Sequence, residues 1–401
     1  MLRVCVIVVL LIALPAVAQD APPDVSALTA ERILELDVAA GLGTTGAQIS
    51  PDGTTFIHVH GTDFCHYSLL GPEIACWDMS EQGVIDEGVV PVDSDSIRWS
   101  PDGQYIAFAI EPWRLLIDSD IFVLSLESGQ FANLTEDDYD RGFSPGREVP
   151  EDVTIDTAPA WTPDGRLTFV RHSAALDEIA PSLWEVDPAG GEPQKIADLL
   201  TAPEGFSYVP SAEWSPDGRH LAYILESRTR DDAGVWLYDV QSGESTMLAA
   251  RPEEIQVFYH ASYSPDGRSL LLLTSNRDLA SMSPRAFVEL GTGYFIVDVE
   301  SGKATPLAAD GAVSSAGWLP EGGLVYTGQD GERRGEGGLY VTADPTVTGR
   351  KVLDFSQGGS RPISLFAPTA RQIAPLFTHP DGLLLLATSE RTLLVVRIRN
   401  G

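Results

Sequence analysis

The side chains of this chain best suited to hold a metal ion lie in one short stretch. His58 and His60 are two residues apart, and His66 follows close behind them. Alternate side chains of a β-strand point to the same face, so His58 and His60 would share one side of a strand. A zinc site needs at least a third ligand, for which His66 is the nearest candidate. We therefore consider these three histidines a candidate site for a divalent cation, with solvated histidines at a strand end as the alternative.

A second chemical motif, Gly142-Phe143-Ser144-Pro145-Gly146, matches the Gly-x-Ser-x-Gly pattern of hydrolase nucleophiles. That pattern requires a buried strand before the serine and a helix after it. Here charged residues flank the motif on both sides, and the proline that follows the serine hinders the required helix. The sequence therefore predicts a polar loop without a catalytic nucleophile.

Acidic side chains cluster in three places, at residues 93–96, 118–120 and 136–140. Calcium takes many oxygen ligands from a compact loop, and none of these stretches has the spacing of an EF-hand. We expect them to be solvated loop acids.

A short motif recurs along almost the whole chain, and the residues described above lie between its copies. The motif is Trp-Ser-Pro-Asp-Gly or a close variant, and its copies begin at Ile49, Trp99, Trp161, Trp214, Tyr263 and Trp318, with a shorter copy at His379. A repeat of about fifty to sixty residues predicts an array of identical supersecondary units. Pro-Asp-Gly favours a tight turn, because proline presets one backbone angle and glycine accepts a left-handed one. The apolar residues on both sides therefore predict a strand, a turn and a second strand.

Each repeat also contains an apolar and aromatic run that ends near an acid and a glycine. Val235–Asp239, followed by Gly243 and a short polar strand, is one example. Each repeat thus supplies two hairpins, and four-stranded sheets of this kind bury both faces when they stack radially. We predict an all-β fold over residues 44–401, a seven-bladed β-propeller of four-stranded antiparallel blades. The recurring aromatic residues of the motif would then pack between blades.

The seventh repeat is too short for four strands, because the chain stops after Thr392–Ile398. The alternating segment Arg32–Asp37 precedes the first repeat and belongs to no blade. We predict that this N-terminal segment supplies the missing outer strand and closes the ring. The alternative is a short helix packed on the outside.

The repeat pattern resembles the TolB-type β-propeller repeat, a unit similar to the WD repeat, over residues 44–401. The resemblance is specific for the fold and nearly silent on activity. Such repeats occur in periplasmic scaffold proteins, in the propeller halves of prolyl-oligopeptidase-type peptidases and in some polyuronate lyases. TolB carries an additional α/β domain before its propeller, whereas here only residues 19–43 separate the N-terminal run from the first repeat. We expect no such domain, and no α/β-hydrolase domain.

The first residues resemble a secretory signal peptide. Arg3 precedes an apolar run from Val4 to Leu14, and small residues lead up to Gln19. The run is short for a transmembrane helix. We predict a signal peptide over residues 1–18, cleavage after Ala18, and a periplasmic or secreted protein, with an uncleaved anchor as the alternative.

Two cysteines follow the signal peptide, Cys65 and Cys76. Export permits a disulfide. We expect the two cysteines to bracket the loop between the second and third strands of the first repeat, where a bridge would contribute about 2–3 kcal/mol. Two buried thiols are the alternative.

The formal net charge is −32. Such a charge opposes binding to nucleic acid, anionic lipids and polyanionic sugars, and favours basic partners, cations or simple solubility in a salty medium. The proportion of hydrophobic residues, 43%, is that of an ordinary globular protein.

The long irregular segments of the chain are residues 61–74, 136–157, 275–293 and 355–374. We expect them to lie on the face opposite the Pro-Asp-Gly turns, where loops on a rigid scaffold often carry function. Five arginines of these segments are candidate binding residues that could hold an anionic group or pair with nearby acids: Arg141, Arg147, Arg277, Arg285 and Arg361.

No nucleophile with a paired base and no complete set of metal ligands emerges from the sequence. We therefore expect an exported, monomeric, non-catalytic propeller, without a cofactor, that binds a protein or peptide through the long loops or the central channel. The alternatives are a carbohydrate-active lyase or hydrolase, or a small-ligand binder, that uses polar residues at the channel mouth. A peptidase-like propeller whose catalytic partner is a separate chain is a third alternative.

Overall fold

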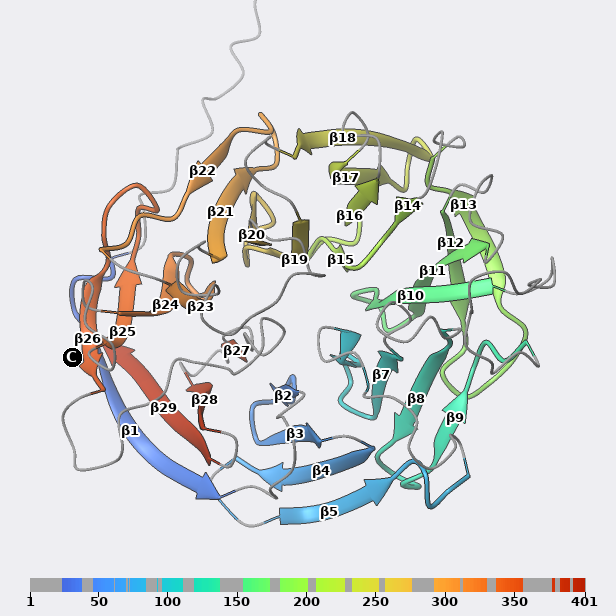
Figure 1. Cartoon of the computed structure of the whole chain (residues 1–401), viewed down its shortest axis with the longest axis horizontal. Coiled ribbons are helices and arrows are strands. Elements are labelled where there is room, and N and C mark those ends of the chain that lie inside the picture. Colours follow the sequence, from blue (N-terminus) through green and yellow to red (C-terminus); the bar gives the residue numbers. More distant parts are fainter. Residues whose placement is uncertain are drawn as a thin grey trace, which may run out of the picture.

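The computed structural model describes most of the repeat array. The described residues are 24–37, 46–60, 62–69, 71, 73–83, 92, 96–110, 119–137, 154–173, 181–200, 207–227, 233–251, 257–275, 292–310, 313–329, 337–355, 377–378, 383–389 and 392–400. Within them the regular structure consists of β-strands, which form sheets arranged around a common centre (Figure 1). The protein is therefore an all-β propeller, as the repeats predicted.

The first three repeats each form one antiparallel sheet. The first contains β2 (Gly46–Ile49), β3 (Thr55–His60), β4 (Asp63–Ser68) and β5 (Glu73–Asp78). The second contains β6 (Arg98–Trp99), β7 (Tyr105–Ala109), β8 (Ile121–Ser125) and β9 (Phe131–Asn133). The third contains β10 (Thr154–Trp161), β11 (Leu167–Ser173), β12 (Ser182–Val186) and β13 (Gln194–Asp198).

The next three repeats follow the same plan. The fourth sheet contains β14 (Ser207–Tyr208), β15 (Ala212–Trp214), β16 (His220–Ser227), β17 (Gly234–Asp239) and β18 (Glu244–Ala250). The fifth contains β19 (Val257–Tyr263), β20 (Ser269–Ser275), β21 (Thr292–Asp298) and β22 (Ala304–Pro306). The sixth contains β23 (Val313–Trp318), β24 (Leu324–Gln329), β25 (Gly337–Thr342) and β26 (Arg350–Asp354).

The last sheet joins the two ends of the described chain. Its strands are β27 (Phe377–Thr378), β28 (Leu383–Ser389), β29 (Thr392–Asn400) and the N-terminal β1 (Leu28–Asp37). Strand β1 pairs with β29 along its length, from Leu28 opposite Asn400 to Asp37 opposite Thr392. The N-terminal segment is thus a strand, and the alternative of an outer helix is wrong.

The sheets are not all alike, so the expectation of seven four-stranded blades is confirmed only in part. Among the described residues, six sheets have four strands, whereas the fourth-repeat sheet has five. Its inner edge is divided into β14 and β15, which both pair with β16. The four-stranded antiparallel blade itself is confirmed.

The Ser-Pro-Asp-Gly turns between the first two strands of a repeat have the predicted chemistry. In the second repeat the Ser100 hydroxyl donates to Asp102 at 2.6 Å and accepts from the Tyr105 backbone N–H at 2.9 Å. Gly103 adopts a φ of 70°, which a residue with a side chain resists. The same arrangement recurs at the turns that contain Gly53, Gly218 and Gly267.

The apolar core lies between neighbouring sheets. One buried cluster joins Ile57 and Phe64 of the first sheet to Phe108 and Phe122 of the second. Comparable clusters join the fourth and fifth sheets and the fifth and sixth. Radial stacking therefore buries both faces of a sheet, which a single four-stranded sheet cannot do. No helix in the described part of the chain has the length and hydropathy to cross a bilayer.

Candidate functional site

A cavity of about 530 Å³ lies at the centre of the molecule, beside the Pro-Asp-Gly turns. Its volume is within the usual range of ligand pockets, about 300–1,000 Å³. The innermost strands β2, β6, β10, β15, β19 and β23 supply most of its lining. The lining residues include Gln48, Arg98, Trp99, Ala160, Trp161, Glu213, Trp214, His260, Ser262, Tyr263, Tyr294, Gly317 and Trp318.

The residue just before the aromatic of each motif determines the polar character of this cavity. The first six copies place Gln48, Arg98, Ala160, Glu213, Ser262 and Gly317 at that position. The turns that follow are nearly identical, whereas this position carries an amide, a cation, a carboxyl, a hydroxyl or a small residue. Such variation on a repeated framework was the sequence signal for this site, and our sequence analysis did not use it.

Several motif tryptophans connect their own sheet to the sheet before it. Trp99 Nε1 donates to Gln48 O at 3.2 Å, and Trp161 Nε1 donates to Arg98 O at 3.2 Å. Trp318 Nε1 donates in the same way to Ser262 O at 3.1 Å. These residues thus pack between sheets as expected, and their rings also form part of the cavity wall.

The fifth repeat lacks this indole hydrogen bond, because it has Tyr263 in place of the tryptophan. The Tyr263 hydroxyl is buried and has no hydrogen-bond partner among the described residues. Glu213 makes the connection instead, since its Oε1 accepts from the Tyr263 backbone N–H at 3.2 Å. A carboxyl group therefore occupies the wall of the cavity between the fourth and fifth sheets.

Burial controls the protonation of the groups in this wall. It raises the pKa of Glu213 to about 7, although nearby Arg98 and the hydrogen bond from Tyr263 act in the opposite direction. Burial, helped by Arg98, lowers the pKa of His260 to about 3. At neutral pH the cavity therefore combines a permanent cation, a carboxyl that is about half ionised and a neutral imidazole. His260 Nδ1 lies 3.4 Å from the Ser211 hydroxyl.

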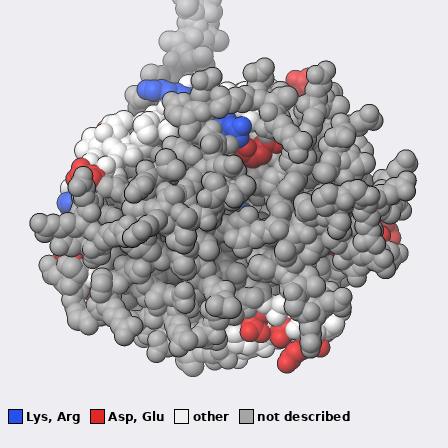
Figure 2. All heavy atoms as spheres, viewed as in Figure 1, with Lys and Arg blue, Asp and Glu red and all other residues white. Residues whose placement is uncertain are grey.

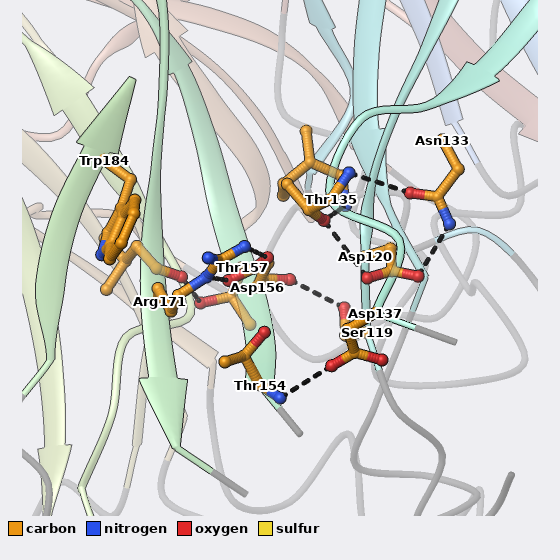
Figure 3. A network of polar contacts seen from close by, with 12 residues as sticks. Ser119, Asp120, Asn133, Thr135, Asp137, Thr154, Asp156, Thr157, Arg171 and Trp184 are labelled. Atoms are coloured by element: carbon orange, nitrogen blue, oxygen red, sulfur yellow. Dashed lines mark hydrogen bonds and ion pairs between the residues drawn. The ribbon is translucent and has the colours of Figure 1, made fainter. Parts of the chain in front are cut away.

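A second polar cluster lies between the second and third sheets (Figure 3). Asp156 of β10 is completely buried and forms a bidentate ion pair with Arg171 of β11. Arg171 Nε donates to Asp156 Oδ1 at 2.8 Å, and Arg171 Nη2 donates to Asp156 Oδ2 at 2.6 Å. The Arg171 guanidinium also lies 4.6 Å from the centre of the Trp184 ring. The Ser119 hydroxyl donates to Asp156 O at 2.9 Å, which ties this pair to the preceding sheet.

Asp120 extends this cluster toward β9. It accepts from Asn133 Nδ2 at 2.7 Å and from the Thr135 hydroxyl at 3.2 Å. Burial and the neighbouring acids Asp156, Glu136 and Asp137 raise its pKa to about 7. The expectation of a solvated acid is therefore wrong for Asp120. The contacts are internal to the protein, and we interpret this cluster as a structural joint between the two sheets.

The structure separates two of the predicted metal ligands. On β3 and β4, His58 lies opposite Cys65, and His66 lies opposite Ile57. Directly paired residues share a face, so His58 and His66 are on opposite faces of the sheet. No group of three or more His, Cys, Asp or Glu residues among those described could hold a metal ion. The side chain of His60 is outside the described part of the chain.

Cys65 and Cys76 form the predicted disulfide, with a Cα–Cα distance of 4.1 Å. Their position differs from the expectation, because they do not bracket the loop between the second and third strands. They lie directly opposite each other on β4 and β5, the third and fourth strands of the first sheet. Most of the stretch 61–74 is correspondingly strand rather than irregular loop.

The other sequence candidates fall outside the described residues. These are the Gly-x-Ser-x-Gly motif at 142–146, the signal peptide at 1–18 and the five arginines, Arg141, Arg147, Arg277, Arg285 and Arg361. Described acidic side chains appear in several separate places on the face seen in Figure 2, and a few basic ones lie among them. We therefore base the site on the central cavity.

Comparison with known proteins supports the fold. One similar chain belongs to the crystal structure of the mitotic checkpoint complex, at 14% identity and a TM-score of 0.56 over 99% of each chain. Another is the hydrazine synthase of Kuenenia stuttgartiensis, at 15% identity and a TM-score of 0.53 over 91% of this chain and 97% of that one. No family model matches the chain, and no curated protein matches it. The neighbours are propellers of the WD40-like type, whereas the closer resemblance to TolB remains a prediction.

Proposed function

We propose that this protein is an exported, non-catalytic β-propeller that binds a protein or peptide partner at the mouth of its central channel. The observation that carries the proposal is the cavity among the innermost strands, whose lining varies from repeat to repeat while the framework stays constant. Aromatic walls with a few polar groups are typical of recognition sites. A similar propeller chain is part of the mitotic checkpoint complex, which agrees with a role in protein binding.

Two features support export. The disulfide between Cys65 and Cys76 is of a kind that persists in oxidising compartments. The N-terminal sequence has the charge, apolar run and small residues of a signal peptide. We propose a periplasmic or secreted monomer that begins at Gln19 after cleavage.

We also infer that the sheets form a closed seven-bladed ring of the TolB type, in which β1 completes the last blade and closes the ring. The pairing of β1 with β29 supports this inference, as do contacts of β2 with β27 and β28. Deletion of residues 27–40 should then lower the melting temperature by many degrees, because it removes an edge strand from the last sheet. An unchanged melting temperature would refute the closure.

A second candidate is a carbohydrate-active enzyme, or a small-ligand binder, at the same channel mouth. The raised pKa of Glu213, about 7, is the observation that favours an enzyme, because it suits a general acid or base at neutral pH. A glycosidase usually needs a second carboxyl group within about 10 Å of the first. Glu213 is the one acidic residue in the described lining of the cavity, so binding is better supported than glycoside hydrolysis.

Selection from a random peptide library tests the proposal. The immobilised protein from Gln19 onward would be panned beside Ser262→Trp, which fills part of the cavity. The control is Val240→Trp, because Val240 is 50% exposed in the turn between β17 and β18. We expect enriched peptides to bind the wild type and the control but not Ser262→Trp. Peptides that bind all three proteins equally would place recognition outside the channel and contradict the proposal.

A further inference from the structure

The titratable and charged groups of the cavity come from three different sheets. Arg98 on β6 interacts electrostatically with both Glu213 on β15 and His260 on β19. Its Nη1 donates to Ile97 O at 2.9 Å, a contact that helps to hold the side chain in place. The permanent positive charge of the described cavity lining is therefore that of Arg98, in a chain whose formal net charge is −32.

We propose that this cavity binds a carboxylate on an apolar or aromatic body, with Arg98 as the anion-binding group and Glu213 protonated in the complex. The inference rests on the proposed function, for which it names the ligand chemistry. Two sources share that chemistry, the C-terminal residue of a peptide and a free organic carboxylate.

The cation is the first reason for this choice. A guanidinium is suited to a carboxylate because its N–H groups match the two oxygens. Besides Arg98, Glu213 is the one residue of the described lining that can carry a charge at neutral pH. An ionised Glu213 would repel an anion beside it. Protonation removes that repulsion, so the ligand and the proton should bind together.

The walls are the second reason. Trp99, Trp161, Trp214 and Trp318 surround the space, and Leu271, Leu273 and Tyr294 extend it toward the gap between the fifth and sixth sheets. Such walls suit an aromatic or aliphatic body rather than a bare inorganic anion. A ligand with a carboxylate at one end and an apolar group at the other would satisfy both regions.

The surroundings of Glu213 make proton uptake possible near neutral pH. The Arg98 guanidinium interacts electrostatically with Glu213, and the Tyr263 backbone N–H donates to the Glu213 carboxyl group. His260, on the same strand as Tyr263, is neutral over this range, since burial and Arg98 lower its pKa. Burial nevertheless has the largest effect on Glu213, and it raises the pKa to about 7.

Calorimetric titration with matched probes tests the inference. The small probes are N-acetyl-phenylalanine and its amide, and the peptide probes are N-acetylated tetrapeptides ending in phenylalanine, with a free or an amidated C-terminus. We expect each acid to bind more tightly than its amide. Since the protonated fraction of a group with a pKa of about 7 falls from about 0.9 to about 0.1 between pH 6 and pH 8, acid binding should weaken roughly tenfold over this range.

Two variants and a control identify the groups. Glu213→Gln resembles the protonated carboxyl and should bind the acids with equal affinity at pH 6 and pH 8. Arg98→Gln should lose the preference for acid over amide. Arg166→Gln alters an arginine of the same type, whose side chain is 54% exposed, and should behave as the wild type does.

The outcomes separate this inference from the proposed function. Tight binding of the tetrapeptide acid alone would support a peptide C-terminus, and equal binding of both acids would support a free carboxylate. Equal binding of acids and amides by the wild type, a pH effect that survives in Glu213→Gln, or no binding by any probe at millimolar concentration would overturn the inference. If library peptides bind through the channel irrespective of amidation, the proposed function stands and this inference fails. If no library peptide depends on the channel but the small acid does, the proposed function fails and this inference stands.

Discussion

Replacement of Arg171 by leucine should destabilise the protein strongly at alkaline pH and weakly in acid. Asp156 is 0% exposed, and the variant would leave its carboxylate in the joint between the second and third sheets without the guanidinium. Removal of one partner from a buried ion pair typically costs about 3–5 kcal/mol. The contact between Arg171 and Trp184 would be lost as well, at a further cost of about 1 kcal/mol.

The pH dependence follows from the protonation of Asp156. Burial raises its pKa to about 6 even with Arg171 present, and removal of the cation would raise the pKa further. At pH 5 the variant therefore carries a neutral Asp156, and most of the electrostatic cost disappears. At pH 8 the carboxylate is either ionised and unpaired or protonated at a free-energy cost.

Urea unfolding followed by tryptophan fluorescence measures this difference. We expect Arg171→Leu to lose about 4–6 kcal/mol at pH 8 and about 1–2 kcal/mol at pH 5. The double variant Asp156→Asn/Arg171→Leu should lose less than Arg171→Leu at pH 8. Arg166→Leu is the surface control, since its partners Asp164 and Glu185 are partly exposed, and it should lose less than about 1 kcal/mol. Equal losses by Arg171→Leu at the two pH values would refute the reasoning.

Three further predictions concern stability. The pKa of Asp120 is about 7 in the folded state, above its ordinary value of 3.8. Between these two values the folded state binds a proton that the unfolded state releases, so the free energy of unfolding falls as the pH rises from about 4 to 7. Asp120→Asn should therefore raise the free energy of unfolding by about 1–3 kcal/mol at pH 8 and change it little at pH 5, and an equal effect at both pH values would contradict this assignment. Conversion of Cys65 and Cys76 to serine should lower the free energy of unfolding by about 2–3 kcal/mol, and the reduced wild type should have the same melting temperature as the double variant. Equal melting temperatures of the variant and the oxidised wild type would show that the disulfide adds no stability. Gly218 has a φ of 69°, so Gly218→Val should cost more than about 1 kcal/mol in thermal unfolding, and unchanged melting would argue against the turn.

The repeat motif predicted the blades because its chemistry is local. Serine, aspartate and glycine determine the turn through contacts within five residues, so the turn at Ser100–Tyr105 could be inferred from its own sequence. The position of the disulfide could not be inferred in the same way. The stretch 63–68 contains polar, aromatic and cysteine residues, and only its pairing with β3 and β5 shows that it is a strand.

The site residues required contacts between repeats that the sequence does not display. Asp120 resembles any loop acid until Asp156, from the next repeat, is placed beside it. Glu213 likewise acquires its environment from Arg98 and Tyr263, which belong to two other repeats. Alignment of the repeats would have shown that the residue before the motif aromatic changes in charge and polarity from copy to copy, and this variation was the available signal.

The central claim, that the channel mouth is the binding site, is tested most directly by fluorine NMR of protein labelled with 5-fluorotryptophan. Trp99, Trp161, Trp214 and Trp318 line the cavity, whereas Trp77, Trp184 and Trp236 lie on the outer strands β5, β12 and β17. Single replacements by phenylalanine assign the signals. On addition of a peptide selected from the library, we predict shifts of the cavity tryptophans and unchanged signals from the outer ones. Shifts confined to the outer tryptophans, with the cavity signals unchanged, would contradict the account.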